Sequence, residues 1–173
     1  MNLQPTLQND LILLRPLSDS DYDPLSKAAS DPLIWETHPQ PNRFKPEVFR
    51  HFFKEAMDSN GALVIVDKKI NKIIGVTGFY DYLKQTSSVI VGFTFLERKY
   101  WGGVYNSEIK KLLINHALSF VKTIYFQVGI SNLRAQKSLE KLGATNTGVQ
   151  EIQVAPTVSL NFYIYKIEKP LQP

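Results

Sequence analysis

Apolar and polar residues along this chain change between the two-residue period of strands and the wider period of helices. Residues 88–96 alternate, with Val89, Val91, Phe93 and Phe95 on one side of the predicted strand. Residues 46–57 instead place apolar side chains three and four positions apart, as an amphipathic helix does. The same criteria predict further strands at residues 10–15, 62–66, 73–82, 123–128, 145–154 and 158–166. Further helices are predicted to begin within 17–21, after the loop 97–105, and at Asn132.

Prolines and glycines mark where these elements end. Pro32, Pro39 and Pro41 predict an extended loop over residues 31–44, and Pro46 suits the first turn of the next helix. The resulting order is one strand, two helices, three antiparallel strands, then helix, strand, helix and a final strand pair. Helices that pack as layers on a mixed sheet give an α+β structure, and we expect one domain over residues 1–173.

Composition narrows the class of protein. The 173 residues are 43% hydrophobic and 21% charged, which is typical of a globular chain. No apolar run approaches the roughly 20 residues that span a bilayer, and the first residues lack the pattern of a signal peptide. Cysteine is absent, which excludes disulfides, thiolate metal sites and a cysteine nucleophile. We therefore expect a cytoplasmic protein with no membrane association and no metal.

The charge balance is mildly basic. A formal charge of +4 and a pI of about 9.2 could attract nucleic acid, an anionic membrane surface or a polyanionic cofactor. No run of basic residues exceeds two, as at Lys68-Lys69, so a nucleic-acid footprint is poorly supported. A phosphate-rich small molecule explains the balance equally well.

The candidate chemistry begins where the strand 88–96 leads through a glycine-containing loop into a helix. The first N–H groups of a helix are unpaired, and the helix dipole adds positive charge there. Gly102 and Gly103 let an anion approach these N–H groups, and Arg98 and Lys99 add charge beside them. The segment matches neither the Walker loop nor the G-x-G-x-x-G fingerprint. Taken alone, two glycines before a helix fit a plain tight turn just as well.

Three segments together resemble one family. Residues 92–108 resemble motif A of the GNAT superfamily, in particular the W-G-x-G-[YIL]-[AN]-x-E variant of its ribosomal-protein N-acetyltransferase branch. The matching positions are Trp101, Gly102, Tyr105, Asn106 and Glu108. Residues 132–144 resemble that branch's N-x-x-[SA]-x-[RK]-x-x-E-K-x-G-[FA], and residues 11–21 its first strand and helix start. One departure is that the second glycine of the motif falls on Val104, which a nest of N–H groups tolerates if its φ is negative.

The resemblance implies an acetyl-CoA site in a mostly antiparallel, mixed sheet flanked by helices. The sheet would splay between its fourth and fifth strands, 88–96 and 123–128. The pantetheine would lie in that gap and pair with the backbone near Phe95 and Leu96. The remaining residues that the resemblance assigns to the cofactor are Arg98, Gly102, Gly103, Val104, Tyr105, Asn106, Asn132 and Lys137.

The resemblance also implies direct transfer of the acetyl group to a primary amine, which must lose a proton before it attacks. Glu36, His38 and Asp81 are the candidate general bases, in segments that cover the acceptor site of this family. The family's usual acid positions match Leu139 and Ala135, which carry no proton to donate. Ser138 is a nearby substitute, although it points roughly 60° away from the Ala135 side at about 100° per residue.

Several alternatives stay open at this stage. The acceptor could be a protein N-terminus, a polyamine, an amino acid or an aminoglycoside, and the chain a monomer or a homodimer. The missing acid leaves room for a CoA-binding module without catalysis. The basic charge leaves room for a nucleic-acid-binding domain.

Overall fold

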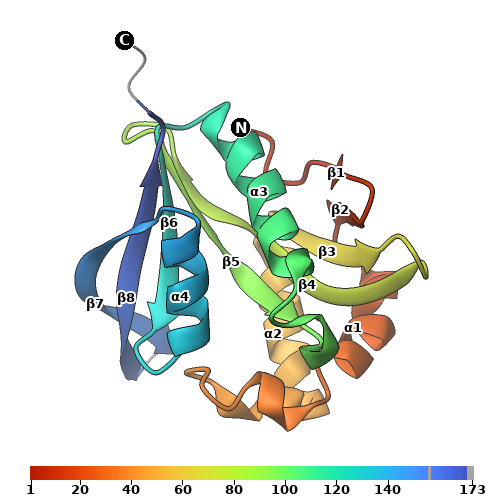
Figure 1. The fold of residues 1–173 in the computed structure, drawn as a ribbon. Coiled ribbons are helices and arrows are strands. Elements are labelled where there is room, and N and C mark those ends of the chain that lie inside the picture. Colours follow the sequence, from red (N-terminus) through yellow and green to blue (C-terminus); the bar gives the residue numbers. More distant parts are fainter. Residues whose placement is uncertain (156, 171–173) are drawn as a thin grey trace.

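The computed structural model, which describes residues 1–155 and 157–170, has one mixed sheet with helices on both faces (Figure 1). The strands are β1 (Leu7–Gln8), β2 (Ile12–Pro16), β3 (Ala62–Asp67), β4 (Lys72–Leu83), β5 (Ser88–Leu96), β6 (Thr123–Gly129), β7 (Thr145–Ala155) and β8 (Val158–Glu168). The α-helices are α1 (Tyr22–Ala28), α2 (Pro46–Asp58), α3 (Val104–Leu118) and α4 (Leu133–Lys141). Every longer strand and every helix predicted from the sequence is present, with ends shifted by a few residues. The short edge strand β1 was not predicted.

The strand order is β1-β2-β3-β4-β5-β6-β8-β7, and the pairing is antiparallel except between β5 and β6. Those two parallel strands pair only at Ser88–Thr123, Val89–Ile124 and Ile90–Tyr125. Beyond this point β5 continues to Leu96 and β6 to Gly129, so the strands diverge while the rest of the sheet stays paired. The predicted splay is therefore confirmed, and it opens the sheet on its carboxyl-terminal side (Figure 1).

The sheet separates two apolar cores. Leu63 and Ile65 of β3 pack towards α3, whereas Val64 of the same strand packs towards α1 and α2. All six residues of β3 are buried, because a central strand covered by helices on both faces has no solvent side. These cores hold β5 in place from both faces.

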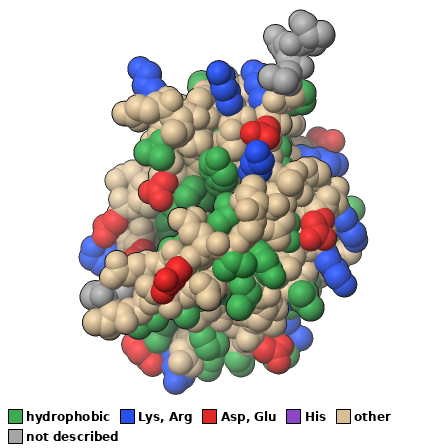
Figure 2. Space-filling model, turned by 90° about the vertical axis from the view of Figure 1, so that its left-hand side faces the viewer, with side chains coloured by type: hydrophobic (Ala, Val, Ile, Leu, Met, Phe, Trp, Pro, Cys, Tyr) green, Lys and Arg blue, Asp and Glu red, His purple; other side chains and the backbone are tan. Residues whose placement is uncertain are grey.

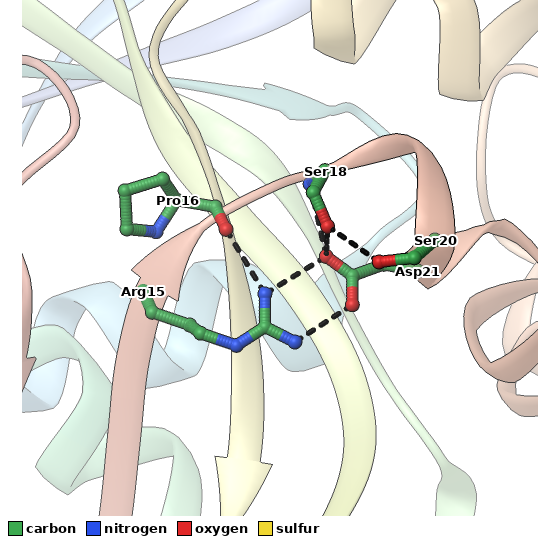
Figure 3. A network of polar contacts seen from close by, with 5 residues as sticks. All are labelled: Arg15, Pro16, Ser18, Ser20 and Asp21. Atoms are coloured by element: carbon green, nitrogen blue, oxygen red, sulfur yellow. Dashed lines mark hydrogen bonds and ion pairs between the residues drawn. The ribbon is translucent and has the colours of Figure 1, made fainter.

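The connection from β2 into α1 is fixed by a partly buried ion pair (Figure 3). The Arg15 guanidinium donates to both carboxylate oxygens of Asp21, at 2.8 and 2.7 Å, and to the Pro16 carbonyl oxygen at 3.0 Å. Asp21 also accepts from the main-chain N–H and the hydroxyl of Ser18, both at 2.9 Å. Burial would raise the pKa of Asp21, but the bonds from Arg15 and Ser18 outweigh it and lower that pKa. Asp21 therefore stays ionised and stabilises the turn between β2 and α1.

Residues 31–44 differ from the extended loop predicted for them. They contain two short 3-10 helices, Pro32–Ile34 and Pro41–Phe44, each with proline in its first turn. Proline's fixed φ suits that position, which is why prolines here start turns as well as end elements. The segment also reaches the end of β6, where Pro39 packs on Gly129 and the Ser131 hydroxyl donates to the Thr37 carbonyl oxygen at 3.2 Å. It thus closes one side of the space between the splayed strands.

Candidate active site

A cleft of about 1110 Å³ occupies the space between the diverging ends of β5 and β6. Its walls come from α3 and α4 on one side and from residues 34–43 on the other. This volume slightly exceeds that of an ordinary small-molecule pocket, so it can hold a long ligand together with part of a second one. A separate hollow of about 690 Å³ beside α2 touches none of the predicted site residues.

One end of the cleft, called here the glycine-loop end, lies at residues 102–106, of which Gly102, Gly103 and Asn106 line the cleft. Gly102 has a φ of +69°, which favours glycine, and a Cβ on Gly102 or Gly103 would meet no atom within 4 Å. Gly103 is the N-cap of α3 and has no side chain to accept from the first helical N–H groups. Val104 is the first residue of α3 and is not among the residues with positive φ, so it meets the condition set for it in the sequence. The N–H groups of residues 104–106 are therefore available to an anion.

Two tyrosines and one carboxylate anchor this loop to β3. The hydroxyls of Tyr100 and Tyr105 donate to the same oxygen of Asp67, at 3.1 and 3.0 Å. Burial, and then the bond to Asp67, raises the pKa of Tyr100 to about 12, so its hydroxyl stays a donor. Because the side chain of Tyr105 is turned towards Asp67, only its main chain is free to serve a ligand.

Cationic side chains of α4 line the cleft, and one of them lies beside the glycine-loop end. Arg134, Lys137 and Lys141 of α4 line the cleft, and the Arg134 guanidinium lies 3.3 Å from the centroid of the Trp101 ring. The Trp101 Nε1–H donates to the Leu96 carbonyl oxygen at 3.0 Å, which ties the loop to the end of β5. Arg98, predicted to join this cluster, forms an ion pair with Asp31 instead of lining the cleft.

Helix α4 involves three predicted residues, Asn132 at its start and the contacting pair Asn106 and Ser138 further along it. The Asn132 side chain caps α4 by accepting from the Ala135 N–H at 3.1 Å. Across the cleft wall, Asn106 Nδ2 donates to the Ser138 hydroxyl at 2.6 Å. Leu139 is buried in the core, and Ala135 lines the cleft without a polar group. Ser138 is therefore the only hydroxyl that α4 contributes to the described cleft wall.

Between the glycine-loop end and the far end, β5 contains a bulge at Phe93. Val76 of β4 pairs with Phe95 but Gly78 pairs with Gly92, so two residues of β5 oppose Thr77 alone. Phe93 has a φ of +54°, a conformation that an aromatic residue rarely adopts. The bulge turns Thr94 into the cleft, where its hydroxyl lies 2.8 Å from that of Thr77.

The far end, called here the aromatic end, lies beneath residues 34–43. The Tyr80 hydroxyl donates to Gln127 Oε1 at 3.1 Å, so the ring crosses from β4 over β5 to β6. Gly92 makes room for it, because a Cβ there would lie 2.5 Å from Tyr80 Cε1. The Arg43 guanidinium lies over the Phe52 ring, 4.5 Å from its centroid, and Nε donates to Gln40 Oε1 at 2.8 Å.

His38 lines the aromatic end, as a candidate base should. Its Nδ1 accepts from the Gln40 N–H at 3.0 Å, and its Nε2 lies 3.2 Å from Arg43 Nη1. Burial, and then the charge of Arg43, lowers the pKa of His38 to about 3. The ring is neutral at physiological pH and has little affinity for a proton from a substrate.

Glu36 and Asp81, the other candidate bases, are exposed and do not line the cleft. Burial raises the pKa of the Tyr80 phenol, and the charge of the adjacent Asp81 raises it further. Both carboxylates therefore lie near cleft residues, and either would need a water molecule to reach a substrate amine.

Lys110 is the most notable cleft residue that the sequence analysis missed. It is 8% exposed, lies on α3 one turn beyond Asn106, and reaches between β5 and β6. The signal was present in the sequence, because Lys110 occupies the stripe that continues through Leu113 and Ala117, both fully buried. Arg43 was also missed, because nothing in the pattern of residues 31–44 shows which side chains turn inwards.

Comparison with known proteins agrees with this architecture. Residues 12–145 match the acetyltransferase (GNAT) domain family. The GNAT-family acetyltransferase from Bacillus anthracis is 18% identical, with a TM-score of 0.76 over 95% of this chain and 98% of its own. Ribosomal-protein-S5-alanine acetyltransferase from Vibrio fischeri is 17% identical, with a TM-score of 0.71 over 98% of this chain and 100% of its own.

A third similar structure contains ligands. The microcin C7 self-immunity acetyltransferase MccE, solved with acetyl-CoA and AMP, is 20% identical, with a TM-score of 0.72 over 97% of this chain and 99% of its own. Comparison with proteins of curated function finds no significant match.

The chain therefore belongs to the GNAT acetyltransferase family, because the family match covers well over half of it. This confirms the class of enzyme that the sequence predicted, an N-acetyltransferase. Within residues 1–155 and 157–170, no helix is long and apolar enough to cross a membrane. Cytoplasmic location and the absence of a metal stay predictions.

Proposed function

We propose that this chain is an acetyl-CoA-dependent N-acetyltransferase, one domain over residues 1–173, that transfers the acetyl group directly to a primary amine. One observation carries the proposal: the start of α3 lies at Gly102, Gly103 and Asn106, which line a cleft that continues between the splayed strands β5 and β6. A CoA ester has an anionic pyrophosphate, which the start of a helix can bind, and a thin pantetheine chain, which the gap between the strands can hold. Family membership supports the same chemistry.

Each predicted cofactor residue has a distinct role in this proposal. The main chain of residues 102–106 binds the pyrophosphate, and Lys137 binds the adenosine phosphates from the rim. Phe95 and Leu96 offer main-chain groups to the pantetheine where β5 has left β6. Asn132 holds the start of α4 beside the pantetheine. Arg98, paired with Asp31, contributes positive charge only if that exposed pair opens.

The aromatic end is the proposed site of the acceptor amine. Among the acceptor classes left open by the sequence, Arg43 favours those that carry an anionic group near the amine, such as an amino acid or a peptide. Its guanidinium lines the cleft, and no ion pair among the described residues includes it. A polyamine or an aminoglycoside would meet repulsion from this charge.

The base is proposed to act through water. His38 is too weakly basic, since its pKa is about 3. Glu36 and Asp81 are ionisable and lie just outside the cleft, where a water molecule can relay the proton from the amine. We expect Glu36→Gln or Asp81→Asn to lower kcat, whereas His38→Gln changes the pH profile of kcat little.

The nucleic-acid alternative has no specific observation in its favour. On the face shown in Figure 2, Lys and Arg side chains are interspersed with Asp and Glu, and no basic stripe is visible there. A CoA-binding module without catalysis differs from the proposed enzyme only in turnover.

The test is release of free thiol from acetyl-CoA in the presence of a panel of amines. The panel contains free amino acids, short peptides with free N-termini, polyamines and aminoglycosides. The proposal predicts thiol release above solvent hydrolysis for at least one amine of the first two groups. Binding of acetyl-CoA with no amine raising the rate would favour the module, and binding of neither acetyl-CoA nor CoA would overturn both.

A further inference from the structure

Lys110 is a buried cation in the wall of the cleft. Its ammonium Nζ lies 3.3 Å from the Thr94 hydroxyl of β5 and 5.3 Å from the centroid of the Phe126 ring of β6. The group thus stands between the two splayed strands, and only 8% of the residue is exposed. Thr94 is itself turned into the cleft by the bulge at Phe93.

No carboxylate in the described part of the chain forms an ion pair with this ammonium. Within residues 1–155 and 157–170, the Lys110 side chain donates a hydrogen bond only to Thr94. The groups that face it from β5 and β6 are a hydroxyl and an aromatic ring, and burial alone lowers its pKa to about 8. An unpaired buried ammonium costs stability, so its presence requires a purpose that the folded chain alone does not supply.

The position of Lys110 along the cleft identifies its partner. The proposed function places the pyrophosphate at residues 102–106 and the pantetheine beside Leu96 and Phe95. A chain that follows β5 in that direction next reaches Thr94, the residue that contacts Lys110. The reactive thioester end, and not the phosphates, therefore lies nearest to Nζ.

We propose that Lys110 is the general acid of the reaction and donates its proton to the departing sulfur of CoA. This inference rests on the proposed function. It assigns to α3 the role for which α4 has only Leu139 and Ala135 at the expected positions.

The proton and electron balance is complete without another reactant. The lone pair of the acceptor nitrogen forms the C–N bond, the C–S bond breaks, and its electron pair stays on sulfur. The Lys110 ammonium gives one proton to that sulfur and becomes a neutral amine. The proton lost by the acceptor nitrogen passes through water to Glu36 or Asp81 and from there to solvent, and Lys110 regains a proton from solvent before the next turnover. A positive charge beside the sulfur also stabilises the thiolate as it forms.

The experiment compares Lys110→Met, whose unbranched side chain is one atom shorter and has no proton to donate, with Lys122→Met. Lys122 is an exposed loop residue next to β6, so its substitution is the matched control. Each variant is measured for acetyl-CoA affinity, for kcat from pH 6 to 10 and for melting temperature. We expect Lys110→Met to lower kcat about 100-fold while Kd for acetyl-CoA changes less than about threefold.

The pH profile separates an acid from a structural residue. Wild-type kcat is expected to fall as the pH rises through about 8, where Lys110 loses its proton, and Lys110→Met should lack this alkaline limb. The melting temperature of the ligand-free variant should rise, because an unpaired buried charge has been removed. A packing role alone would lower the melting temperature and leave the shape of the profile unchanged.

The absence of cysteine permits a direct rescue. Lys110→Cys introduces the only thiol, and alkylation with 2-bromoethylamine rebuilds a lysine-like amine there. The amine of this product is less basic than that of lysine because of its sulfur atom. Activity should therefore return with an alkaline limb at lower pH than in the wild type.

Three results would overturn the assignment while leaving the proposed function intact. They are unchanged kcat in Lys110→Met, a large loss of acetyl-CoA affinity with kcat preserved, or stable acetylation of Lys110 during turnover, seen as added mass. A wild-type protein that neither binds acetyl-CoA nor releases thiol would instead refute the proposed function itself.

Discussion

The glycine-loop end of the cleft offers a ligand main-chain N–H groups, whereas the aromatic end offers side chains. Residues 102–106 are contiguous and act through the backbone at the start of α3. The aromatic end takes His38 and Arg43 from one segment, Tyr80 from β4 and Gln127 from β6. A contiguous main-chain site leaves a motif in the sequence, while a site assembled from distant side chains does not. The difference explains why the cofactor can be inferred from sequence and the acceptor cannot.

The largest expected effect comes from Gly92→Val, which targets the aromatic end. A side chain at Gly92 collides with the Tyr80 ring, since even a Cβ would lie 2.5 Å from Cε1. Displacing the ring should lower kcat/KM for the acceptor about 100-fold, with the affinity for acetyl-CoA within about threefold of wild type. Steady-state kinetics and calorimetric titration measure the two quantities. An equal loss of both would show that the two ends are not independent.

Arg43→Gln tests the charge of the aromatic end. An anionic acceptor loses a charged hydrogen bond, which corresponds to a rise in its KM of about tenfold or more. Acetyl-CoA affinity should not change. Arg43→Lys keeps the charge but loses the planar contact with Phe52, and it is the matched control. Its KM for the anionic acceptor should lie between the values of the wild type and Arg43→Gln. If Arg43→Gln lowers KM for polyamines but leaves KM for anionic acceptors unchanged, the preference for an anionic acceptor is contradicted.

Asp67→Ala tests the support of the glycine-loop end. The hydroxyls of Tyr100 and Tyr105 would lose their common acceptor, at a cost of about 1–3 kcal/mol in the free energy of unfolding. The Kd for acetyl-CoA should rise several-fold as the loop loosens, with the acceptor KM unchanged. Asp67→Asn keeps one acceptor oxygen and should have the smaller effect. If denaturant unfolding shows both variants as stable as the wild type, this anchor is unimportant.

The smallest expected effect separates two adjacent glycines. Gly102→Ala forces an alanine to a φ of +69° and should destabilise the protein by about 1 kcal/mol. Gly103→Ala places its Cβ in open space at a φ of −103°, so stability should change by only a few tenths of a kcal/mol. Chemical denaturation of both variants measures the difference. Equal losses would mean that the loop's conformation is not what requires Gly102.

Much of the fold could be predicted because its signals are local. The strand over residues 88–96 and the helix start at Pro46 each depend on neighbouring residues, and both elements appear where predicted. The single apolar side predicted for that strand is wrong, because the bulge at Phe93 leaves Val91 in the core beneath α3 and turns Phe95 into the core beneath α2. The splay between β5 and β6 was predicted only through the family resemblance, because divergence of two strands leaves no periodic pattern. The 3-10 helices within 31–44 were not predicted, because three closely spaced prolines indicated an extended loop, whereas Pro32 and Pro41 each begin a short helical turn.

The candidate site divides in the same way. The Gly102–Gly103 pair and the Asn132 cap follow from local rules and lie in the cleft. Arg98 was assigned by proximity in sequence, yet its guanidinium is paired with Asp31, 67 residues away. Glu36 and Asp81 are exposed, and the burial that makes His38 a weak base depends on Arg43 and on packing that only the folded chain contains. Lys110 was overlooked although its place in a buried stripe could have revealed it.

Calorimetric titration of the wild-type protein with acetyl-CoA tests the central claim most directly. The cleft is predicted to bind one acetyl-CoA per chain, and ligand at about 100 times its Kd should stabilise the fold by about 2.7 kcal/mol. Absence of binding at millimolar acetyl-CoA, with no gain in stability, would contradict the assignment of the glycine-loop end and everything inferred from it.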